Sequence, residues 1–214
     1  MNTTPLARFG RHAFGVAAAA VVLSAGVAGC SSGSDSPKSP GSSQPAASQA
    51  AAKSGKPFGT KSVPTRLTIP RLKVNAPVQQ VGLAPDGTVQ TPSLDDPDMT
   101  GWYKNGPTPG QLGPAVILGH IDTAKTGPAV FFKLRQLKPG DSVTVKRTDG
   151  SSATFAVQRQ LDVSKKQFPT KKVYGDISYA GLRLITCGGK FDRAKGSYEN
   201  NTIVFAKLTS TTAA

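Results

Sequence analysis

Short apolar runs separated by turn residues fill the chain beyond residue 62, and this pattern limits the folds it can adopt. Turn signals lie at residues 84–87, 138–141 and 148–150. Helix-like spacing is confined to residues 130–137, where Pro139 limits it to a turn or two. We expect strands over residues 66–69, 78–81, 115–119, 142–146, 153–160, 181–186 and 202–208. Many short strands with little helix predict an all-β sandwich or a closed barrel.

Two of these runs carry a reactive side chain at their C-terminal end. Residues 115–118 and 182–185 are apolar at consecutive positions, which is typical of central strands buried on both faces. The first run leads to His120 and the second to Cys187. If the two strands are neighbours, both side chains reach one rim of the sheet, a rigid location for chemistry.

The N-terminal 30 residues have the pattern of an export signal. Arg8 and Arg11 precede an apolar run from Gly15 to Gly29, which is short for a transmembrane helix because spanning needs about 20 apolar residues. The run ends in Val-Ala-Gly-Cys, which resembles a bacterial lipobox and implies that Cys30 is lipid-modified. The alternative is a plain signal or anchor in which Cys30 is incidental. Both predict an extracytoplasmic protein held at the cell envelope.

Residues 31–62 are almost wholly Ser, Pro, Gly, Ala, Gln and Lys, so we expect a disordered tether followed by one domain over residues 63–214. The formal net charge is +14, of which the signal carries +2 and the tether +3, leaving +9 on the domain. The basic residues are scattered and no nucleic-acid motif accompanies them, so no nucleic-acid partner is expected. An anionic envelope is the simpler partner for this charge.

One cysteine and one histidine remain once the signal is set aside. Cys30 and His12 belong to the N-terminal segment, so Cys187 has no partner for a structural disulfide. A thiolate activated by an imidazole is a nucleophile, which is the functional interpretation of Cys187 and His120. The structural alternative is a small buried Cys187 and a hydrogen-bonded loop histidine. Because His120 precedes Cys187, papain-like and related peptidases do not fit, and the L,D-transpeptidase signature is absent.

The residues around His120 and Cys187 resemble those of the sortases. Residues 117–122, Ile-Leu-Gly-His-Ile-Asp, are similar to the sortase histidine segment, and residues 184–187, Leu-Ile-Thr-Cys, to its cysteine strand. Thr-Gly-Pro-Ala-Val-Phe at 126–131 and Thr-Cys-Gly-Gly-Lys-Phe-Asp-Arg at 186–193 resemble most closely the actinobacterial class F, or class E/F, sortases. The likeness extends through nearly all of residues 64–208.

This resemblance implies a closed eight-stranded sortase-type β-barrel with short helical turns and a cysteine transpeptidase without a cofactor. Cys187 would attack the Thr-Gly bond of a Leu-Pro-x-Thr-Gly-like sorting signal on surface proteins. His120 would shuttle protons while an amine on peptidoglycan or its precursor releases the thioacyl enzyme. Two alternatives stay open: a non-enzymatic β-barrel lipoprotein that binds a partner, and a sortase-fold peptidase that mainly hydrolyses.

The third catalytic group is an arginine in sortases, and Arg193 is the only arginine after Cys187. The resemblance favours Arg193 as the cation that stabilises the oxyanion or holds the substrate, with Asn201 as a neighbouring polar contact. Tyr198 belongs to the same class F pattern, and the resemblance implies that it contacts the substrate or supports a residue that does.

Several nearby residues admit two interpretations. Thr186 orients substrate or fills a strand position, and Gly188 allows a close backbone approach. Asp122 orients the imidazole or caps a turn. Trp102, Tyr103 and Phe131 line the groove or belong to the core. No zinc cluster is expected, and Asp95, Asp96 and Asp98 are interpreted as a solvated loop.

Overall fold

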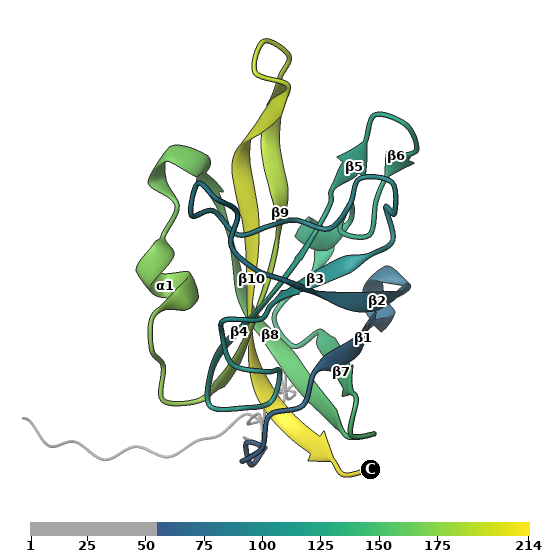
Figure 1. Cartoon of the computed structure of the whole chain (residues 1–214), viewed down its shortest axis with the longest axis vertical. Helices are drawn as coiled ribbons and strands as arrows, with labels where there is room; N and C mark the ends of the chain where they lie inside the picture. Colours follow the sequence, from purple (N-terminus) through teal and green to yellow (C-terminus); the bar gives the residue numbers. More distant parts are fainter. Residues whose placement is uncertain (1–54) are drawn as a thin grey trace, which may run out of the picture. The chain divides into compact units, whose positions relative to one another are not determined.

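The computed structural model describes residues 55–214, and the predicted signal, Cys30 and most of the predicted tether lie outside that range (Figure 1). The described chain is mostly β. Its strands are β1 (Pro64–Ile69), β2 (Val74–Val81), β3 (Thr100–Tyr103), β4 (Gly113–Gly119), β5 (Asp122–Thr123), β6 (Gly127–Pro128), β7 (Ser142–Arg147), β8 (Ser152–Ser164), β9 (Ala180–Asp192) and β10 (Ser197–Thr212). Within residues 55–214, helical structure is limited to three 3₁₀ turns, η1 (Pro70–Leu72), η2 (Leu134–Gln136) and η3 (Lys165–Gln167), and to α1 (Thr170–Tyr174).

Eight of these strands close into a barrel in the order β1-β2-β3-β4-β9-β10-β8-β7. The predicted all-β class, closed eight-stranded barrel and short helical turns are therefore confirmed. Most neighbours are antiparallel, but β2 pairs with β3 and β4 pairs with β9 in parallel. The short strands β5 and β6 form a separate two-stranded sheet.

All seven expected strands are present, and two kinds of prediction were incomplete. The expected list omitted β3, because its four residues, Thr-Gly-Trp-Tyr, form no recognisable apolar alternation, and it omitted β5 and β6, because two residues give no pattern. β8, β9 and β10 continue well past their apolar runs, because the β9–β10 hairpin extends beyond the barrel and carries polar residues (Figure 1). The predicted helical turn at residues 130–137 is the 3₁₀ turn η2.

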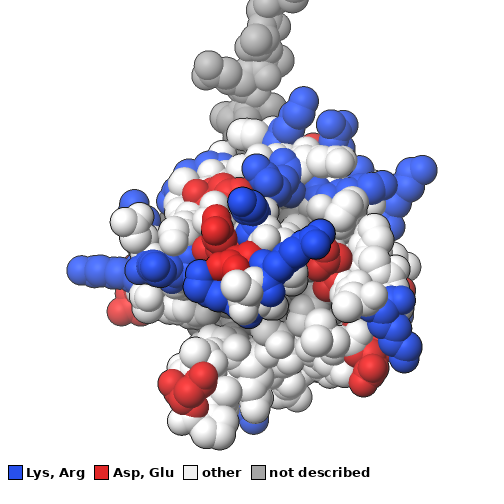
Figure 2. Space-filling model, turned by 90° about the horizontal axis from the view of Figure 1, so that it is seen from above, with Lys and Arg blue, Asp and Glu red and all other residues white. Residues whose placement is uncertain are grey.

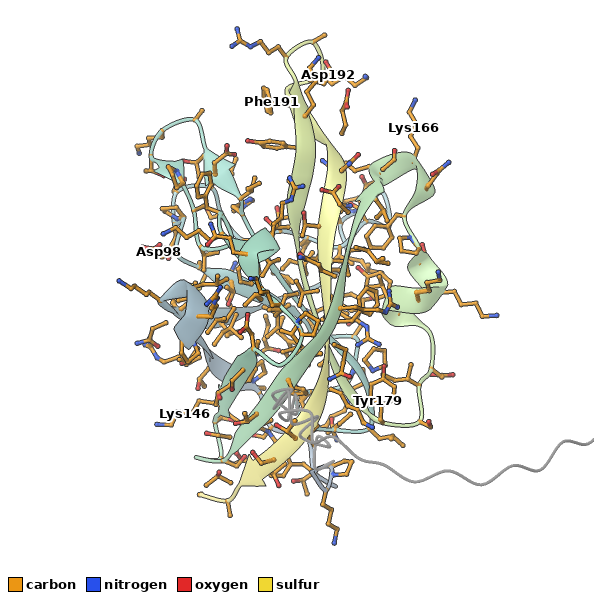
Figure 3. All side chains as sticks on the ribbon, turned by 180° about the vertical axis from the view of Figure 1, so that it is seen from behind. Asp98, Lys146, Lys166, Tyr179, Phe191 and Asp192 are labelled. Atoms are coloured by element: carbon orange, nitrogen blue, oxygen red, sulfur yellow. The ribbon has the colours of Figure 1, made fainter. Side chains whose placement is uncertain are left out.

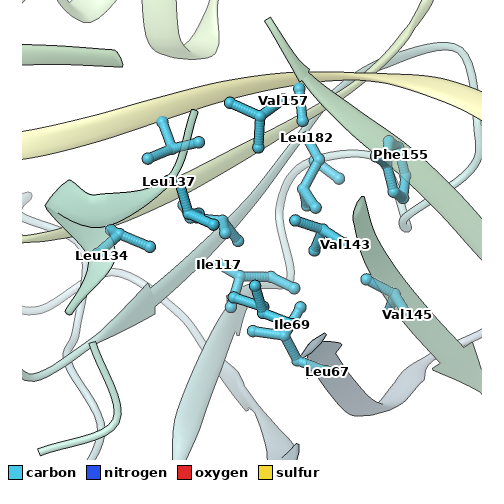
Figure 4. Packing of buried hydrophobic residues seen from close by; sticks show 14 of the residues in the cluster. Leu67, Ile69, Ile117, Leu134, Leu137, Val143, Val145, Phe155, Val157 and Leu182 are labelled. Carbon is cyan, nitrogen blue, oxygen red and sulfur yellow. The ribbon is translucent and has the colours of Figure 1, made fainter. Parts of the chain in front are cut away.

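The main core fills the inside of the barrel and is made mostly of aliphatic side chains, together with Trp102, Phe131 and Phe155 (Figure 4). On β9, Leu182 and Leu184 are fully buried in this core, which fixes the opposite direction for the side chains of Arg183 and Ile185. A second cluster lies outside the barrel, where Val173 of α1 packs with Val116 and Ile185. β4 and β9 are therefore covered on both faces, as their continuous apolar runs predicted.

The packed part of the chain begins earlier than the expected boundary at residue 63. Phe58 stacks on Arg147, with the guanidinium carbon 4.0 Å from the ring centroid, and its backbone N–H donates to the Gly110 carbonyl at 2.9 Å. The Arg147 side chain is fully buried, and its Nη2 donates to the Thr60 carbonyl at 2.7 Å. These residues were assigned to the tether because a single aromatic residue in a polar stretch gives no sign of a partner distant in sequence.

Charged side chains cover the outside of this domain. In the view of Figure 2, Lys and Arg side chains point outward around the visible face, with Asp and Glu among them. The four salt bridges found in the described part of the chain involve Arg71, Arg135, Arg147 and Lys195. Within residues 55–214, no helix has the length and apolar character needed to cross a bilayer.

We predict that Phe58→Ala destabilises the domain by roughly 1–3 kcal/mol, because it removes a cation–π contact and apolar burial over Arg147. Denaturant-induced unfolding measures this change. Phe132→Ala is the matched control, because Phe132 is 48% exposed and its loss should change stability by no more than about 0.5 kcal/mol. Equal stability of Phe58→Ala and the unchanged chain would mean that the contact of the Phe58 ring with Arg147 contributes nothing to the fold.

Candidate active site

The parallel pair β4 and β9 brings His120 and Cys187 to the same end of the barrel. Leu118 pairs with Ile185 at the last position of the parallel register, and each reactive residue lies two positions further along its chain. Neighbouring strands are separated by about 4.8 Å, so the two residues share one rim. Both line a pocket of about 610 Å³ together with Asp122 and Tyr198. Each of the two is only partly buried, so a ligand has access to them.

His120 is held by a backbone carbonyl rather than by a carboxylate. Its Nε2 is 2.7 Å from the Pro92 carbonyl oxygen, which belongs to the loop between β2 and β3 (residues 82–99). Two residues further along that loop, Leu94 lines the same pocket. The sequence did not predict this contact, because nothing in residues 82–99 resembles a catalytic motif.

Asp122 contacts Tyr198 instead of the imidazole. The Tyr198 hydroxyl donates a short hydrogen bond to Asp122 Oδ2, and in the described structure no hydrogen bond joins Asp122 to His120. This bond connects β10 to β5 across the pocket. It also raises the pKa of Tyr198 to about 12, because the nearby carboxylate accepts from the neutral phenol and repels the phenolate; burial contributes further.

The neighbours of Cys187 on β9 face the inside of the barrel. Thr186 is 4% exposed, and its hydroxyl has no hydrogen-bond partner among the described residues. A Cβ at Gly188 would lie 2.6 Å from Thr202 Oγ1, so a glycine is required there for packing between β9 and β10. These positions favour the structural interpretation of Thr186, and they explain Gly188 by strand packing rather than by substrate approach.

Arg193 and Asn201 occupy different parts of the β9–β10 hairpin. Asn201 pairs directly with Cys187, so their side chains project from the same face of the sheet. Arg193 lies in the exposed turn that follows β9, next to Asp192, which Figure 3 labels near the hairpin tip. Arg193 is not among the residues that line the pocket of Cys187. Asn201 is also absent from that lining, so the structure pairs Asn201 with Cys187 in the sheet register and leaves Arg193 in the exposed hairpin turn.

Apolar side chains form the mouth of the site. Leu94 and Phe191 are 59% and 45% exposed, although both line the pocket. Phe191 packs edge-on against Tyr198, with ring centroids 5.1 Å apart. Exposed apolar side chains beside a pocket are typical of a binding surface. Neither residue was predicted in this role.

The aromatic residues suggested as groove residues lie elsewhere. Trp102 and Phe131 are 4% and 0% exposed and belong to the core. Tyr103 lines a separate pocket of about 750 Å³, together with Leu112 and Tyr174, near the start of β4. That pocket is larger, but neither His120 nor Cys187 lines it.

The comparisons with known proteins agree with this geometry. A family model described as the sortase domain matches residues 67–209. Sortase C-1 from Actinomyces oris has 22% identity and a TM-score of 0.51, covering 67% of this chain and 72% of that one. Sortase A from Listeria monocytogenes has 15% identity and a TM-score of 0.54, covering 72% and 92%. SrtA sortase from Actinomyces oris has 22% identity and a TM-score of 0.53, covering 77% and 89%. A comparison with curated proteins found no match.

The chain belongs to the sortase family, because the family model matches more than half of its length. Sortases are cysteine transpeptidases of the cell envelope that join surface proteins bearing sorting signals to amine acceptors. The solved structures share less than 25% identity with this chain, so they establish its fold and not its substrate.

We predict that Asp122→Ala lowers the pKa of Tyr198 from about 12 toward the ordinary tyrosine value of about 10, because the change removes the hydrogen-bond acceptor and its negative charge. More phenolate should then form after a rapid jump to about pH 11, measured by ultraviolet absorbance before unfolding. In the Tyr198→Phe background, Asp122→Ala should have no such effect. Equal phenolate in the unchanged chain and in Asp122→Ala would contradict the hydrogen bond.

Proposed function

We propose that this chain is a sortase-type transpeptidase that cleaves a Leu-Pro-x-Thr-Gly-like signal and transfers the acyl part to an amine at the cell envelope. The observation that carries the proposal is the shared pocket of His120 and Cys187, the one imidazole and the one thiol of residues 55–214. Their delivery by two parallel, fully packed strands supports a preorganised site.

In the first step Cys187 would act as the nucleophile and His120 as acid and base. The thiol proton passes to the imidazole, and the sulfur forms a bond to the Thr carbonyl carbon of the signal. The C–N bond to Gly then breaks, while the imidazolium protonates the leaving amine. The product is a thioester between Cys187 and the N-terminal part of the substrate.

In the second step an amine replaces the thiol. The amine nitrogen bonds to the thioester carbon and gives a proton to His120, the C–S bond breaks, and the proton returns to the Cys187 sulfur. Peptidoglycan or its precursor is the proposed acceptor. The peptidase alternative differs only here, since water would take the place of the amine.

Asn201 is the proposed donor to the oxyanion, because it lies directly across from Cys187 on β10. Its amide and nearby backbone N–H groups could donate where negative charge develops. The family pattern favours Arg193 as the cation that stabilises the oxyanion or holds substrate; because Arg193 lies outside the pocket lining, we propose the second of these roles for it. The apolar rim of Leu94 and Phe191 suits the apolar residues of a Leu-Pro-containing signal.

The finer assignments rest on sequence alone. Assignment to class F is supported by three stretches of sequence: residues 117–122 around His120, residues 126–131, and residues 186–193 around Cys187. The lipobox-like residues before Cys30 support attachment to the outer face of the membrane through lipid, with a signal anchor as the alternative. The non-enzymatic lipoprotein alternative would use the pocket for binding only and requires no reaction at Cys187 or His120.

The test is cleavage of a fluorogenic Leu-Pro-x-Thr-Gly peptide by the full chain, with and without a glycine or diaminopimelate-type amine. We expect cleavage and a peptide–amine conjugate, identified by mass. Cys187→Ala should abolish cleavage, and His120→Ala should lower its rate by about 10²–10⁴-fold. Cleavage without conjugate would favour the peptidase alternative. No cleavage of any signal-like peptide would favour the binding module.

The same assay separates the roles of Asn201 and Arg193. Asn201→Ala should lower kcat by about 10²–10³-fold with little change in KM, as expected for the loss of an oxyanion donor. Arg193→Ala should mainly raise KM. Lys190→Ala is the matched control, because Lys190 is another exposed cation of the hairpin. A loss of kcat in Arg193→Ala but not in Asn201→Ala would assign the oxyanion to Arg193.

A further inference from the structure

In many catalytic triads a carboxylate contacts the histidine ring, whereas here a main-chain carbonyl makes that contact. His120 Nε2 lies 2.7 Å from the Pro92 carbonyl oxygen, from a residue 28 positions earlier in the sequence. Asp122, the carboxylate next to His120 in sequence, is engaged by the Tyr198 hydroxyl. In the described chain the Pro92 carbonyl is the hydrogen-bond partner found for the imidazole.

The Pro92 carbonyl is held in place by the packing of its loop. The Pro92 ring is buried, and a Cβ added at Gly101 of β3 would lie 3.2 Å from its Cγ, so the ring rests on that glycine. Before Pro92, the Gln90 N–H donates to the Gly82 carbonyl at 3.0 Å. After it, the Pro97 carbonyl accepts from the Val130 N–H at 2.9 Å. The loop is therefore anchored on both sides of the contact.

The backbone that carries the imidazole is equally constrained. The His120 carbonyl accepts from the Phe131 N–H at 2.9 Å, and the Ile121 carbonyl accepts from the Ala129 N–H at 3.0 Å. The Phe131 ring packs so closely on Gly119 that a Cβ there would lie 2.7 Å from it. The backbones of both partners are therefore anchored, and the fold brings the Pro92 carbonyl within hydrogen-bond distance of the His120 imidazole.

A carbonyl oxygen has no hydrogen to donate, so His120 Nε2 must carry the proton of this bond. In the neutral ring, Nδ1 is then the unprotonated, basic nitrogen. In the imidazolium, Nδ1 carries the second proton and Nε2 keeps its own. The Pro92 carbonyl thus selects which nitrogen can exchange a proton.

We propose that the Pro92 carbonyl is the positioning group for His120, holding the ring as the Nε2–H tautomer so that Nδ1 performs every proton transfer. This inference rests on the proposed transpeptidase function. The Cys187 thiol proton moves to Nδ1 and then to the leaving amine nitrogen as the C–N bond breaks. The acceptor amine gives its proton to Nδ1, which returns it to the sulfur as the C–S bond breaks. Nε2 keeps its proton throughout.

The same loop connects the imidazole to the mouth of the pocket. Leu94 lines the pocket two residues after Pro92 and is largely exposed. A substrate that packs on Leu94 therefore contacts the loop that orients His120. This arrangement separates two effects: Leu94 should govern substrate binding, and Pro92 should govern the imidazole.

The first experiment observes the imidazole directly by ¹⁵N and ¹H NMR. The full chain has two histidines, so His12→Asn leaves His120 as the only imidazole. We expect a pyridine-type ¹⁵N signal for Nδ1, and a downfield proton on Nε2 that exchanges slowly with water. An Nδ1–H tautomer, or an Nε2 proton in fast exchange, would overturn the proposal.

The second experiment loosens the loop. Pro92→Gly should make the Nε2 proton exchange rapidly and lower kcat by roughly 10–100-fold, by analogy with the loss of a group that orients a metal-ligating histidine. Pro85→Gly is the matched control, because Pro85 lies in the exposed turn of the same loop and should change neither. Leu94→Ala should raise KM and retain the slowly exchanging proton.

These outcomes separate the inference from the proposed function. If the NMR signature is present but no signal-like peptide is cleaved, the transpeptidase function fails and the tautomer assignment stands. If peptide is cleaved while Pro92→Gly leaves the Nε2 proton or kcat unchanged, the positioning role fails and the function stands. The thermal stability of Pro92→Gly, compared with Pro85→Gly, shows whether either variant is partly unfolded.

Discussion

The parallel pairing of β4 with β9 is the interaction on which the rest of the site depends. β4 and β9 are distant in the sequence, yet their register runs without interruption from Gly113 opposite Ala180 to Leu118 opposite Ile185. Both strands are covered inside the barrel and outside it, so a slip of one position would move a full set of apolar side chains to the wrong face. The spatial relation of His120 to Cys187 is thus fixed by core packing.

The sequence predicts the two central strands because local patterns encode them, whereas their pairing with each other was only a condition of the argument from the residues and is supplied by the structure. Continuous apolar runs before His120 and Cys187 indicate central strands, and the turn signals indicate a β fold. The part of the site on the β9–β10 hairpin, which carries Arg193 and Asn201, is harder to predict. The distance of Arg193 from Cys187 depends on how far β9 and β10 continue as paired strands, and polar residues such as Lys190 give no apolar pattern from which to judge that length. Asn201 lies opposite Cys187 only because a register shift near Tyr198 sets the pairing.

Contacts of isolated residues with distant partners could not be predicted at all. Phe58 belongs to a polar stretch, and its partner Arg147 is buried although arginine is usually exposed. Pro92 contributes a carbonyl, a group that every residue carries and that no motif marks. Trp102 and Phe131 are candidates for the groove because aromatic residues serve both binding and packing. Their burial in the closed barrel shows that both belong to the core.

The nucleophile, the imidazole and the apolar mouth of the pocket are held in place by different kinds of contact, and this difference has a chemical consequence. Cys187 lies within a strand whose neighbours are buried, so its backbone has no freedom to adapt. His120 follows a strand end and is fixed by tertiary contacts, of which the Pro92 carbonyl reaches the ring itself. Leu94 and Phe191 are exposed and can adjust to a ligand. In the proposed acyl transfer, a pocket built in this way would keep its reacting groups fixed while its apolar mouth accommodates the substrate, which would reduce the entropy lost on reaching the transition state.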